Sequence, residues 1–290
     1  ISKYISTRLI IKKLYFSIST KQIKLKYREF IPSKKLSDYI QLIWILESET
    51  PEEKFEREII LPDGIVELVL HYREPFFTYD SEGHKFLQPQ GFAISQIQNF
   101  IEIESNGAIG FISIRFYPWG AYHFFSEPIG NFLDGTISIE KLWEQDHQII
   151  LELLKDSSAK KKVKTVNDFL LSKLFTNDKL RRIDDALKLI RDTKGLLTVD
   201  ELSDRMNMSY KQPERNFLAT VGTTPKIFSR NTRFLHLCHH LKEYETRSLS
   251  ELTYEMGYYD QSHFIKEFRQ FSGFTPKKYF EQKNIAFTDL

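Results

Sequence analysis

The last third of the chain contains the same residue pattern twice. Six positions match between the copies: Glu201/Glu251, Leu202/Leu252, Met206/Met256, Phe217/Phe268, Gly222/Gly273 and Pro225/Pro276. The first three pairs lie 50 residues apart and the last three lie 51 apart, so one residue is inserted between them. A repeat of this length predicts two copies of one supersecondary unit, each packed against its neighbour.

In the first copy, the residue types predict two helices joined by a short turn. Thr198 is suited to cap a helix over Val199–Met206. Asn207 tolerates the left-handed backbone of a tight turn, and Ser209 can cap the helix that follows.

The second copy has the same signals. Ser248 or Ser250 can cap a helix that runs through Met256, and Gly257 permits the turn. Asp260 can cap the next helix, which places three phenylalanines on one side: Phe264, Phe268 and Phe271.

Two helices joined by about four residues form a helix-turn-helix, whose second helix can lie in the DNA major groove. A plain helical bundle would show the same hairpins. The connection between the copies favours DNA: Thr224 as N-cap and Pro225 at the first position open a helix predicted to reach Tyr244. Its 18–20 residues would span about 27–30 Å, near the ~34 Å between successive major-groove faces.

The polar residues at the start of each second helix are the candidate base-reading residues, because glutamine pairs with adenine and lysine or arginine with guanine. In the first copy these are Tyr210, Lys211, Glu214 and Arg215, and in the second Asp260, Gln261, Ser262, His263 and Lys266. Candidate phosphate contacts are Lys226, Arg230, Lys277 and Lys278.

Charge supports this interpretation only weakly. The chain carries 41 Lys+Arg and 39 Asp+Glu, and from Leu196 onward the counts are 13 and 12, which indicates modest non-specific DNA affinity. Residues 1–26 hold seven basic residues and no acid, so we expect a basic arm there. No apolar run reaches the ~18 residues that a membrane span needs, and none in the first twenty residues reaches the roughly 7–15 residues of a signal sequence's hydrophobic region. We therefore expect a cytoplasmic protein without a membrane partner.

The first half has the composition of a β-rich domain. Short apolar runs at 39–46, 58–61, 65–72, 92–94, 100–103 and 109–116 are separated by turn signals such as Pro62-Asp63-Gly64. Helical periodicity appears in 139–154 and 163–174, with a lysine-rich gap at 160–162 between them, and dominates after Asn177. Asp178 is suited to cap the next helix, over 180–193.

The stretch Gly257–Pro276, GYYDQSHFIKEFRQFSGFTP, resembles the second helix-turn-helix of the AraC/XylS family of bacterial transcription regulators. The resemblance covers about 179–283. It implies a seven-helix DNA-binding domain in which a long helix joins two helix-turn-helix units, with reading positions at Lys211, Glu214, Arg215, Gln261, Ser262, His263 and Lys266. Three earlier segments, at 30–40, 61–68 and 114–121, resemble an uncharacterised domain often found before this module.

The predicted fold class is therefore α+β in two domains, with a barrel-like β-rich domain first and an all-α domain second. We expect a basic arm at 1–26, a sensor or association domain at 27–150, a helical linker at 151–178 and the AraC-type DNA-binding domain at 179–290. In the wider family such N-terminal domains bind effectors or form dimers.

Pro213 departs from the family pattern, which has an apolar helix-compatible residue there. With Ser209 as N-cap, Pro213 would be the fourth helical residue, where its missing N–H costs a hydrogen bond. The sequence therefore predicts a first recognition helix that is distorted or begins near Gln212. On this basis Pro213→Leu should strengthen operator binding.

Other constellations favour structural roles. His236, His239 and His240 lack the glutamate of a metalloprotease motif, and Cys238 is expected to be a packed core residue. In the first half, five polar residues could form a site or a structural cluster: Asp63, Glu67, His71, Arg115 and His123. We predict no catalytic residue, no metal and no cofactor.

The predicted function is a non-enzymatic, sequence-specific transcription regulator, an activator, that binds double-stranded operator DNA. Expected further partners are a small-molecule effector, RNA polymerase and a second copy of the chain. Two alternatives stay open: an interaction module whose DNA binding is lost through Pro213, and an enzyme that uses the N-terminal domain.

Overall fold

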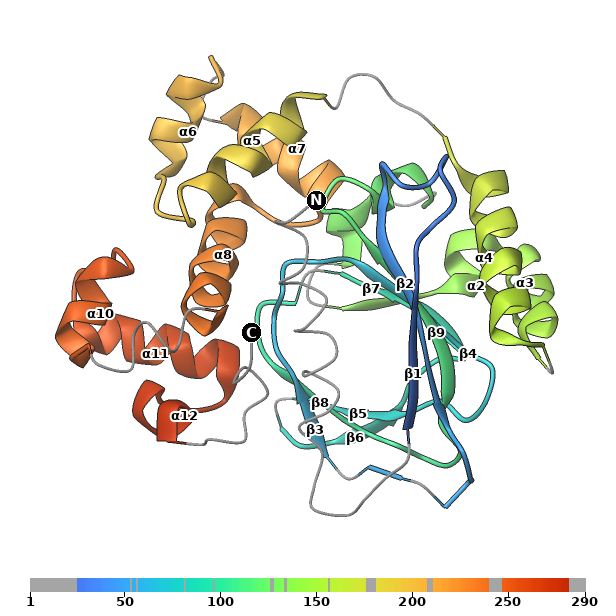
Figure 1. Ribbon diagram of the computed structural model, residues 1–290. Helices are drawn as coiled ribbons and strands as arrows, with labels where there is room; N and C mark the ends of the chain where they lie inside the picture. Colours follow the sequence, from blue (N-terminus) through green and yellow to red (C-terminus); the bar gives the residue numbers. More distant parts are fainter. Residues whose placement is uncertain are drawn as a thin grey trace.

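Two antiparallel β-sheets make up most of the N-terminal half of the chain (Figure 1). This computed structural model describes residues 25–281 except 53, 56, 81, 96, 126–127, 133–134, 156, 176–180, 208–210 and 240–246. The six-stranded sheet has the order β1 (Leu25–Phe30), β2 (Ile40–Ser48), β9 (Gly110–Phe116), β4 (Glu67–His71), β7 (Gly91–Ile94), β10 (Thr136–Ser138). The four-stranded sheet has the order β3 (Glu58–Ile60), β8 (Ile101–Glu104), β5 (Phe77–Tyr79), β6 (Lys85–Leu87).

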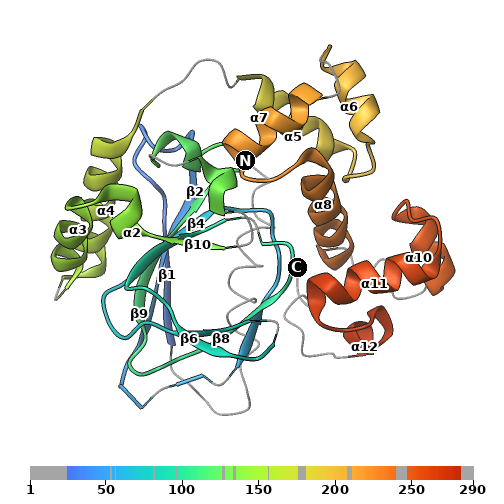
Figure 2. The same ribbon diagram turned by 180° about the vertical axis from the view of Figure 1, so that it is seen from behind.

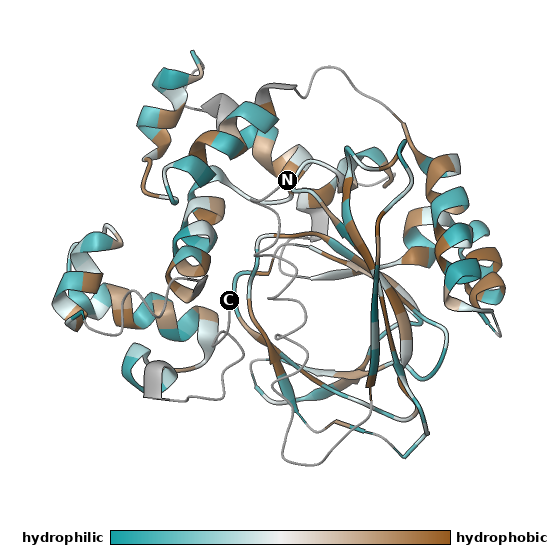
Figure 3. Cartoon of the chain, in the orientation of Figure 1, coloured by the Kyte–Doolittle hydropathy of each residue, from teal (hydrophilic) through white to brown (hydrophobic). Residues whose placement is uncertain are grey.

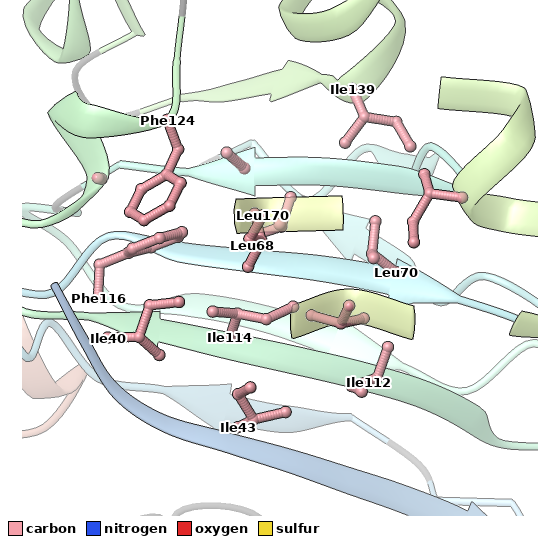
Figure 4. Close-up of a cluster of buried hydrophobic side chains, with 14 of the residues drawn as sticks. Ile40, Ile43, Leu68, Leu70, Ile112, Ile114, Phe116, Phe124, Ile139 and Leu170 are labelled. Carbon is pink, nitrogen blue, oxygen red and sulfur yellow. The ribbon is translucent and has the colours of Figure 1, made fainter. Parts of the chain in front are cut away.

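The central strands of the six-stranded sheet are apolar on both faces. In β2, Ile43 and Ile45 point into one core while Leu42, Trp44 and Leu46 point into another. Successive side chains of a strand alternate between faces, so a continuous apolar run is what a sheet covered on both sides requires. The four-stranded sheet contributes Ile103 to the second core. Figure 4 shows the first core, in which strand residues meet helical residues such as Leu170.

Three helices cover the other face of the six-stranded sheet: α2 (Ile139–Trp143), α3 (Asp146–Leu154) and α4 (Ala159–Lys173). Leu142, Ile150 and Leu170 from these helices are buried with the strand residues of the first core. Both α3 and α4 have hydrophilic residues beside hydrophobic ones (Figure 3), as expected for helices with one solvent-facing side. The described part of 151–178, expected as a helical linker, thus packs into the core of the β-rich domain.

The segment 139–154, whose periodicity indicated helix, is helical and consists of two helices, α2 and α3. Glu144 has φ 43° and separates α2 from α3, a backbone conformation that a non-glycine residue adopts at a cost. The lysine-rich stretch 160–162 was expected to be a gap, but it lies inside α4, whose N-cap is Ser158. Lys162 is buried, with its ammonium 4.2 Å from the ring centre of Tyr72.

The C-terminal region is helical, so the expected order of a β-rich part followed by an α-helical part is confirmed. Its described helices are α5 (Arg181–Asp192), α6 (Val199–Arg205), α7 (Lys211–Val221), α8 (Pro225–His239), α10 (Leu249–Glu255), α11 (Gln261–Ser272) and α12 (Pro276–Glu281). Figures 1 and 2 show these helices on one side of the sheets, with α2–α4 on the opposite side. No helix in the described part of the chain has the length and apolarity that crossing a lipid bilayer requires.

The sequence predictions that concern 1–24, Asn177, Asp178 and Tyr244 lie outside the described residues. The last two residues of the expected basic arm, Leu25 and Lys26, begin β1. β1 pairs with β2 in a register that places Tyr27 opposite Leu46. Strands β5, β6 and β10 were not expected, because each has three residues and too short a pattern to be distinguished from a loop.

Gly222, which follows α7, has φ 78° and lies against Ile129 of the β-rich domain. Gly83 has φ 86° but nothing within 4 Å of the place where a Cβ would lie. Gly83→Ala should therefore lower the free energy of unfolding only by the backbone cost of about 1–2 kcal/mol. Gly222→Ala should lower it by clearly more, because the added methyl also collides with Ile129. Chemical denaturation of both variants checks this, and equal losses would contradict the contact.

Candidate DNA interface

The first helix of each repeated unit begins with a reciprocal cap. Thr198 Oγ1 accepts from the backbone N–H of Glu201 at 3.2 Å, and the Glu201 carboxylate accepts from the backbone N–H of Thr198 at 2.8 Å. Ser248 and Glu251 repeat the arrangement at 3.2 and 2.7 Å. The hydrogen bonds from these N-caps lower the pKa of both glutamates. The repeated glutamates are therefore conserved between the copies as capping-box residues.

The turns between the paired helices are built as the sequence predicts. Asn207 has φ 50° and Gly257 has φ 71°. Asp260 caps α11, since its Oδ1 accepts from the N–H of His263 at 2.8 Å. Ser209, the expected cap of α7, lies outside the described residues. Thr224 Oγ1 accepts from the N–H of Ile227 at 3.3 Å and caps α8, which begins at Pro225.

The helix α11 divides cleanly into a buried and an exposed side. Phe264, Phe268 and Phe271 are at most 2% exposed and join Phe234 and Leu237 of α8 in one core. The opposite side carries the polar residues predicted to read bases, all of them exposed: Gln261, Ser262, His263 and Lys266. The Gln261 amide donates to Ser250 Oγ at 2.5 Å, which orients this side chain at the start of the helix.

A buried carboxylate ties α11 to α8. Glu267 is 4% exposed and accepts from Arg230 Nε at 2.6 Å and from the Tyr258 hydroxyl. Arg230 Nη2 also donates to Gln270 at 3.1 Å. Arg230 was expected to contact phosphate, but the structure places its guanidinium in this interhelical network. These contacts hold α11 against α8, and none of the described contacts of Arg230 is directed outward.

In the first unit, the described part of α7 begins at Lys211 and is continuous α-helix through Pro213. The first four N–H groups of a helix have no intrahelical acceptor, and a proline there removes no hydrogen bond. The position of Pro213 within the first turn depends on residues 208–210, which lie outside the described part of the chain, so the expected distorted start, or start near Gln212, stays a prediction. Glu214 and Arg215 are exposed, and Phe217 is fully buried in the core of this unit. Tyr210 lies outside the described residues, and of Lys211 only the backbone is described.

The predicted phosphate-contacting lysines are exposed at the starts of the helices that follow each unit. Lys226 lies in the first turn of α8, and Lys277 and Lys278 lie in the first turn of α12. Lys226 and Lys277 occupy equivalent positions, each directly after the repeated proline. The structure thus brings one such lysine into each unit.

Two exposed tyrosines beside α11 were missed at the sequence level. Tyr259 is 90% exposed and directly precedes the N-cap Asp260, and Tyr254 of α10 is 73% exposed. The neighbouring Tyr258 is buried and bonded to Glu267. The signal that could have found Tyr259 is its place in the turn, outside the apolar spacing of both flanking helices.

In the β-rich domain, Asp63, Glu67 and Arg115 form a buried ionic cluster. The Arg115 guanidinium pairs with Asp63 and lies 3.5 Å from Glu67, which also accepts from Trp44 Nε1 at 3.0 Å and Ser113 Oγ at 2.5 Å. Burial raises the pKa of Glu67, and Arg115 acts against that rise. These contacts fit the structural interpretation of the three residues. Asp63 also accepts from the N–H of Ile65 at 3.1 Å, as expected of a turn residue.

His71 is fully buried against Phe76, Phe92 and Phe111. Its Nε2–H donates to Gln88 at 3.2 Å, and burial lowers the pKa of His71 to about 4. The unfolded chain binds a proton near pH 6.5 while the native protein does not, so stability is lost as pH falls from 6.5 towards 4. Relative to His71→Phe, the wild type should lose about 3 kcal/mol over this range. Urea denaturation at each pH measures the difference, and parallel curves would contradict it.

Cys238 is a core residue, as expected. Its thiol is 1% exposed, burial raises its pKa to about 12, and Tyr279 Oη lies 3.8 Å from its Sγ. Among the residues that the structure describes, no three histidine, cysteine or acidic side chains are grouped to hold a metal ion.

Comparison with known sequences agrees with this geometry. The family described as "Helix-turn-helix domain" matches residues 202–282, and the family described as "Domain of unknown function (DUF6597)" matches residues 28–138. The second match covers the three segments whose resemblance was noted above. Among curated proteins, none matches the chain.

Among solved structures, ToxT from Vibrio cholerae is similar at 10% identity and a TM-score of 0.43, over 90% of this chain and 98% of ToxT. The AraC-like transcriptional activator CuxR is similar at 10% identity and a TM-score of 0.22, over 96% of this chain and 89% of CuxR. The chain thus carries an AraC-type helix-turn-helix domain at 202–282, which contains the duplicated units, behind a DUF6597 domain at 28–138.

Proposed function

We propose that this protein regulates transcription by reading two adjacent major-groove segments with the starts of α7 and α11. The observation that carries the proposal is the division of α11 into a fully buried aromatic side and an exposed polar side with Gln261, His263 and Lys266. The equivalent positions of α7 include the exposed Arg215, which corresponds to Lys266 in the repeat. Basic residues at the same place in both units suit guanine or phosphate contacts at two sites.

Selection of genomic DNA fragments with the purified protein tests this proposal. We expect enrichment of a motif with two short conserved parts, and a steep loss of affinity with rising salt because lysines and arginines displace counterions. Well-folded protein that enriches no motif, or whose DNA affinity is independent of salt, would contradict the proposal.

We further propose that a small molecule modulates the protein at a cavity beside the chain segment that leads to α5. The cavity has a volume of about 400 Å³ and is lined by Phe124, Trp143, Phe175, Lys141 and Lys173, among others. The backbone of Phe175 is held by His123, through Phe175 N–H to His123 O at 2.9 Å and His123 Nδ1–H to Phe175 O at 2.7 Å. Because Phe175 lies between α4 and α5 in the sequence, a ligand against its ring would act where the two parts of the chain connect.

A panel of small aromatic and zwitterionic compounds tests the cavity. A compound that raises the Tm of the wild type and changes its affinity for the selected DNA should lose both effects in Lys141→Ala/Phe175→Ala. Retention of both effects would place the effector elsewhere.

Association through α3 is the second proposed property of the N-terminal domain. Ile149 and Leu153 are 56% and 51% exposed and lie one turn apart on α3. Such a pair suits a second copy of the same helix. In analytical ultracentrifugation, a dimer of the wild type should become a monomer in Ile149→Lys/Leu153→Lys. RNA polymerase is the expected partner at the promoter, which transcription from the selected site with purified polymerase would test.

Pro213 bears on the alternative of an interaction module without DNA binding. Because the described part of α7 is continuous helix through Pro213, we expect Pro213→Leu to change affinity for the selected DNA by less than about threefold. An electrophoretic mobility-shift titration at constant salt measures this. A gain of tenfold or more would show that the proline impairs the first unit.

A further inference from the structure

The two glycines that end the recognition helices both lie against side chains of the N-terminal domain. A Cβ at Gly222, after α7, would collide with Ile129, the first residue of the short 3-10 helix η3 (Ile129–Phe132). A Cβ at Gly273, after α11, would lie 3.1 Å from Cε1 of Phe100. Gly222 and Gly273 are equivalent in the repeat and both have φ 78°. One domain therefore contacts both units at the same structural position.

Further contacts join the N-terminal domain to the two helix-turn-helix units. Gly130 approaches Leu218 of α7, with a Cβ there lying 2.7 Å from the Leu218 carbonyl oxygen. On the other unit, Leu61 is 6% exposed within the core formed by Phe234, Phe264 and Phe268. The N-terminal domain thus packs against the end of each recognition helix with apolar side chains.

The two units need such a support because their cores are separate. Phe217 and Phe228 belong to the core of the first unit, while Phe234 and Phe268 belong to that of the second. The helix α8 joins them, and its described length of 15 residues extends about 22 Å. The units meet directly where Leu196 lies against Gly257. A single helix between two separate cores resists bending and twisting less than the same helix braced at both ends.

The bracing contacts leave the reading residues accessible. In Figure 1, α11 runs from α10 on the outside towards the β-sheets. Phe100 contacts the residue after the last turn of α11, whereas Gln261, His263 and Lys266 are exposed in its first half. In the first unit, Ile129 likewise contacts the end of α7 and Arg215 lies near its start.

We propose that Ile129 and Phe100 brace the two recognition helices, so that the N-terminal domain sets the DNA spacing the protein accepts. The inference rests on the proposed function and concerns how its two units are positioned. Inserting one base pair between the two reading sites increases their separation by about 3.4 Å and rotates one relative to the other by about 35°. A braced pair of helices cannot follow this change, and an unbraced pair can adapt by bending α8.

The experiment compares two DNA probes, the selected site and the same site with one base pair inserted between its two conserved parts. The wild type should bind the selected site about 100-fold more tightly than the inserted one. In Ile129→Ala/Phe100→Ala this ratio should fall about tenfold. Phe100→Ala alone removes the half-buried member of the pair and should give a smaller fall in a protein that stays folded.

The matched control is Ile31→Ala/Phe86→Ala, which makes the same two truncations at side chains that are 76% and 52% exposed. It should leave the ratio at the wild-type value. An unchanged ratio in folded Ile129→Ala/Phe100→Ala would overturn the brace, as would tighter binding of both probes with the same ratio, which indicates occlusion instead. If the wild type selects no site, the proposed function fails; if it selects one but tolerates the insertion, only the brace fails.

Discussion

The triple variant Gln261→Ala/His263→Ala/Lys266→Ala should bind the selected DNA at least about 100-fold more weakly than the wild type, since each base contact contributes roughly 1–3 kcal/mol. All three side chains are exposed, and the N-cap Asp260 and the core phenylalanines are untouched, so the Tm should change little. Fluorescence anisotropy with labelled DNA at fixed salt measures the affinity. Lys160→Ala, an exposed lysine of α4, controls for the lost positive charge.

A second set of variants separates sequence-specific base contacts from non-specific electrostatic attraction to the DNA phosphates. Lys226→Ala/Lys277→Ala/Lys278→Ala should weaken binding to selected and scrambled DNA by the same factor and reduce the salt dependence. The α11 triple variant should instead abolish the preference for the selected sequence. If both sets reduce the two affinities equally, α11 does not read bases in this protein.

The largest effect on stability is expected from Arg115→Met. Arg115 has a 4% exposed side chain between Asp63 and Glu67, and its removal leaves two carboxylates without their counter-charge. Breaking a buried pair in this way costs about 3–5 kcal/mol. Arg57→Met is the matched control, because Arg57 is 52% exposed beside Glu102, and such surface pairs contribute about 0–1 kcal/mol.

The loss of stability caused by Arg115→Met should also depend on pH. Burial already raises the pKa of Glu67, and removal of Arg115 raises it further. The native variant then binds a proton that the unfolded chain has released, so its stability falls as pH rises from 5 to 7. Urea denaturation of wild type and variant at both values tests the sign. If the variant is less stable than the wild type by a larger amount at pH 5 than at pH 7, the raised pKa of Glu67 is not the cause of the pH dependence.

The helical half could be predicted closely because its signals are local. Thr198, Ser248 and Asp260 cap helices through hydrogen bonds to residues three positions away, and Gly257 and Gly273 adopt the left-handed backbone that ends a helix. The spacing of Phe264, Phe268 and Phe271 likewise determines which side of α11 is buried, and so which residues face outward. Each of these depends on residues within one or two turns, where sequence distance and spatial distance agree.

Several features could not be predicted, because they depend on which distant residues meet. Arg230 is separated by 37 residues from Glu267, and no local pattern distinguishes it from a phosphate-binding arginine. The strands β5 and β10 obtain their backbone partners from β8 and β7, so three residues suffice for a strand that would be a loop in isolation.

By itself, the sequence determined two copies of a capped helix-turn-helix, their buried and exposed sides, and a β-rich domain before them. Only the tertiary structure decided three further features. The helices α2–α4 cover the core of that domain, and Arg230 links α8 to α11 through Glu267. Ile129 and Phe100 contact the equivalent glycines of the two units. The reason is that caps, turns and periodicity act over a few residues. Packing between domains depends instead on shape complementarity among residues far apart in the sequence, such as Ile129 with Gly222 and Phe100 with Gly273.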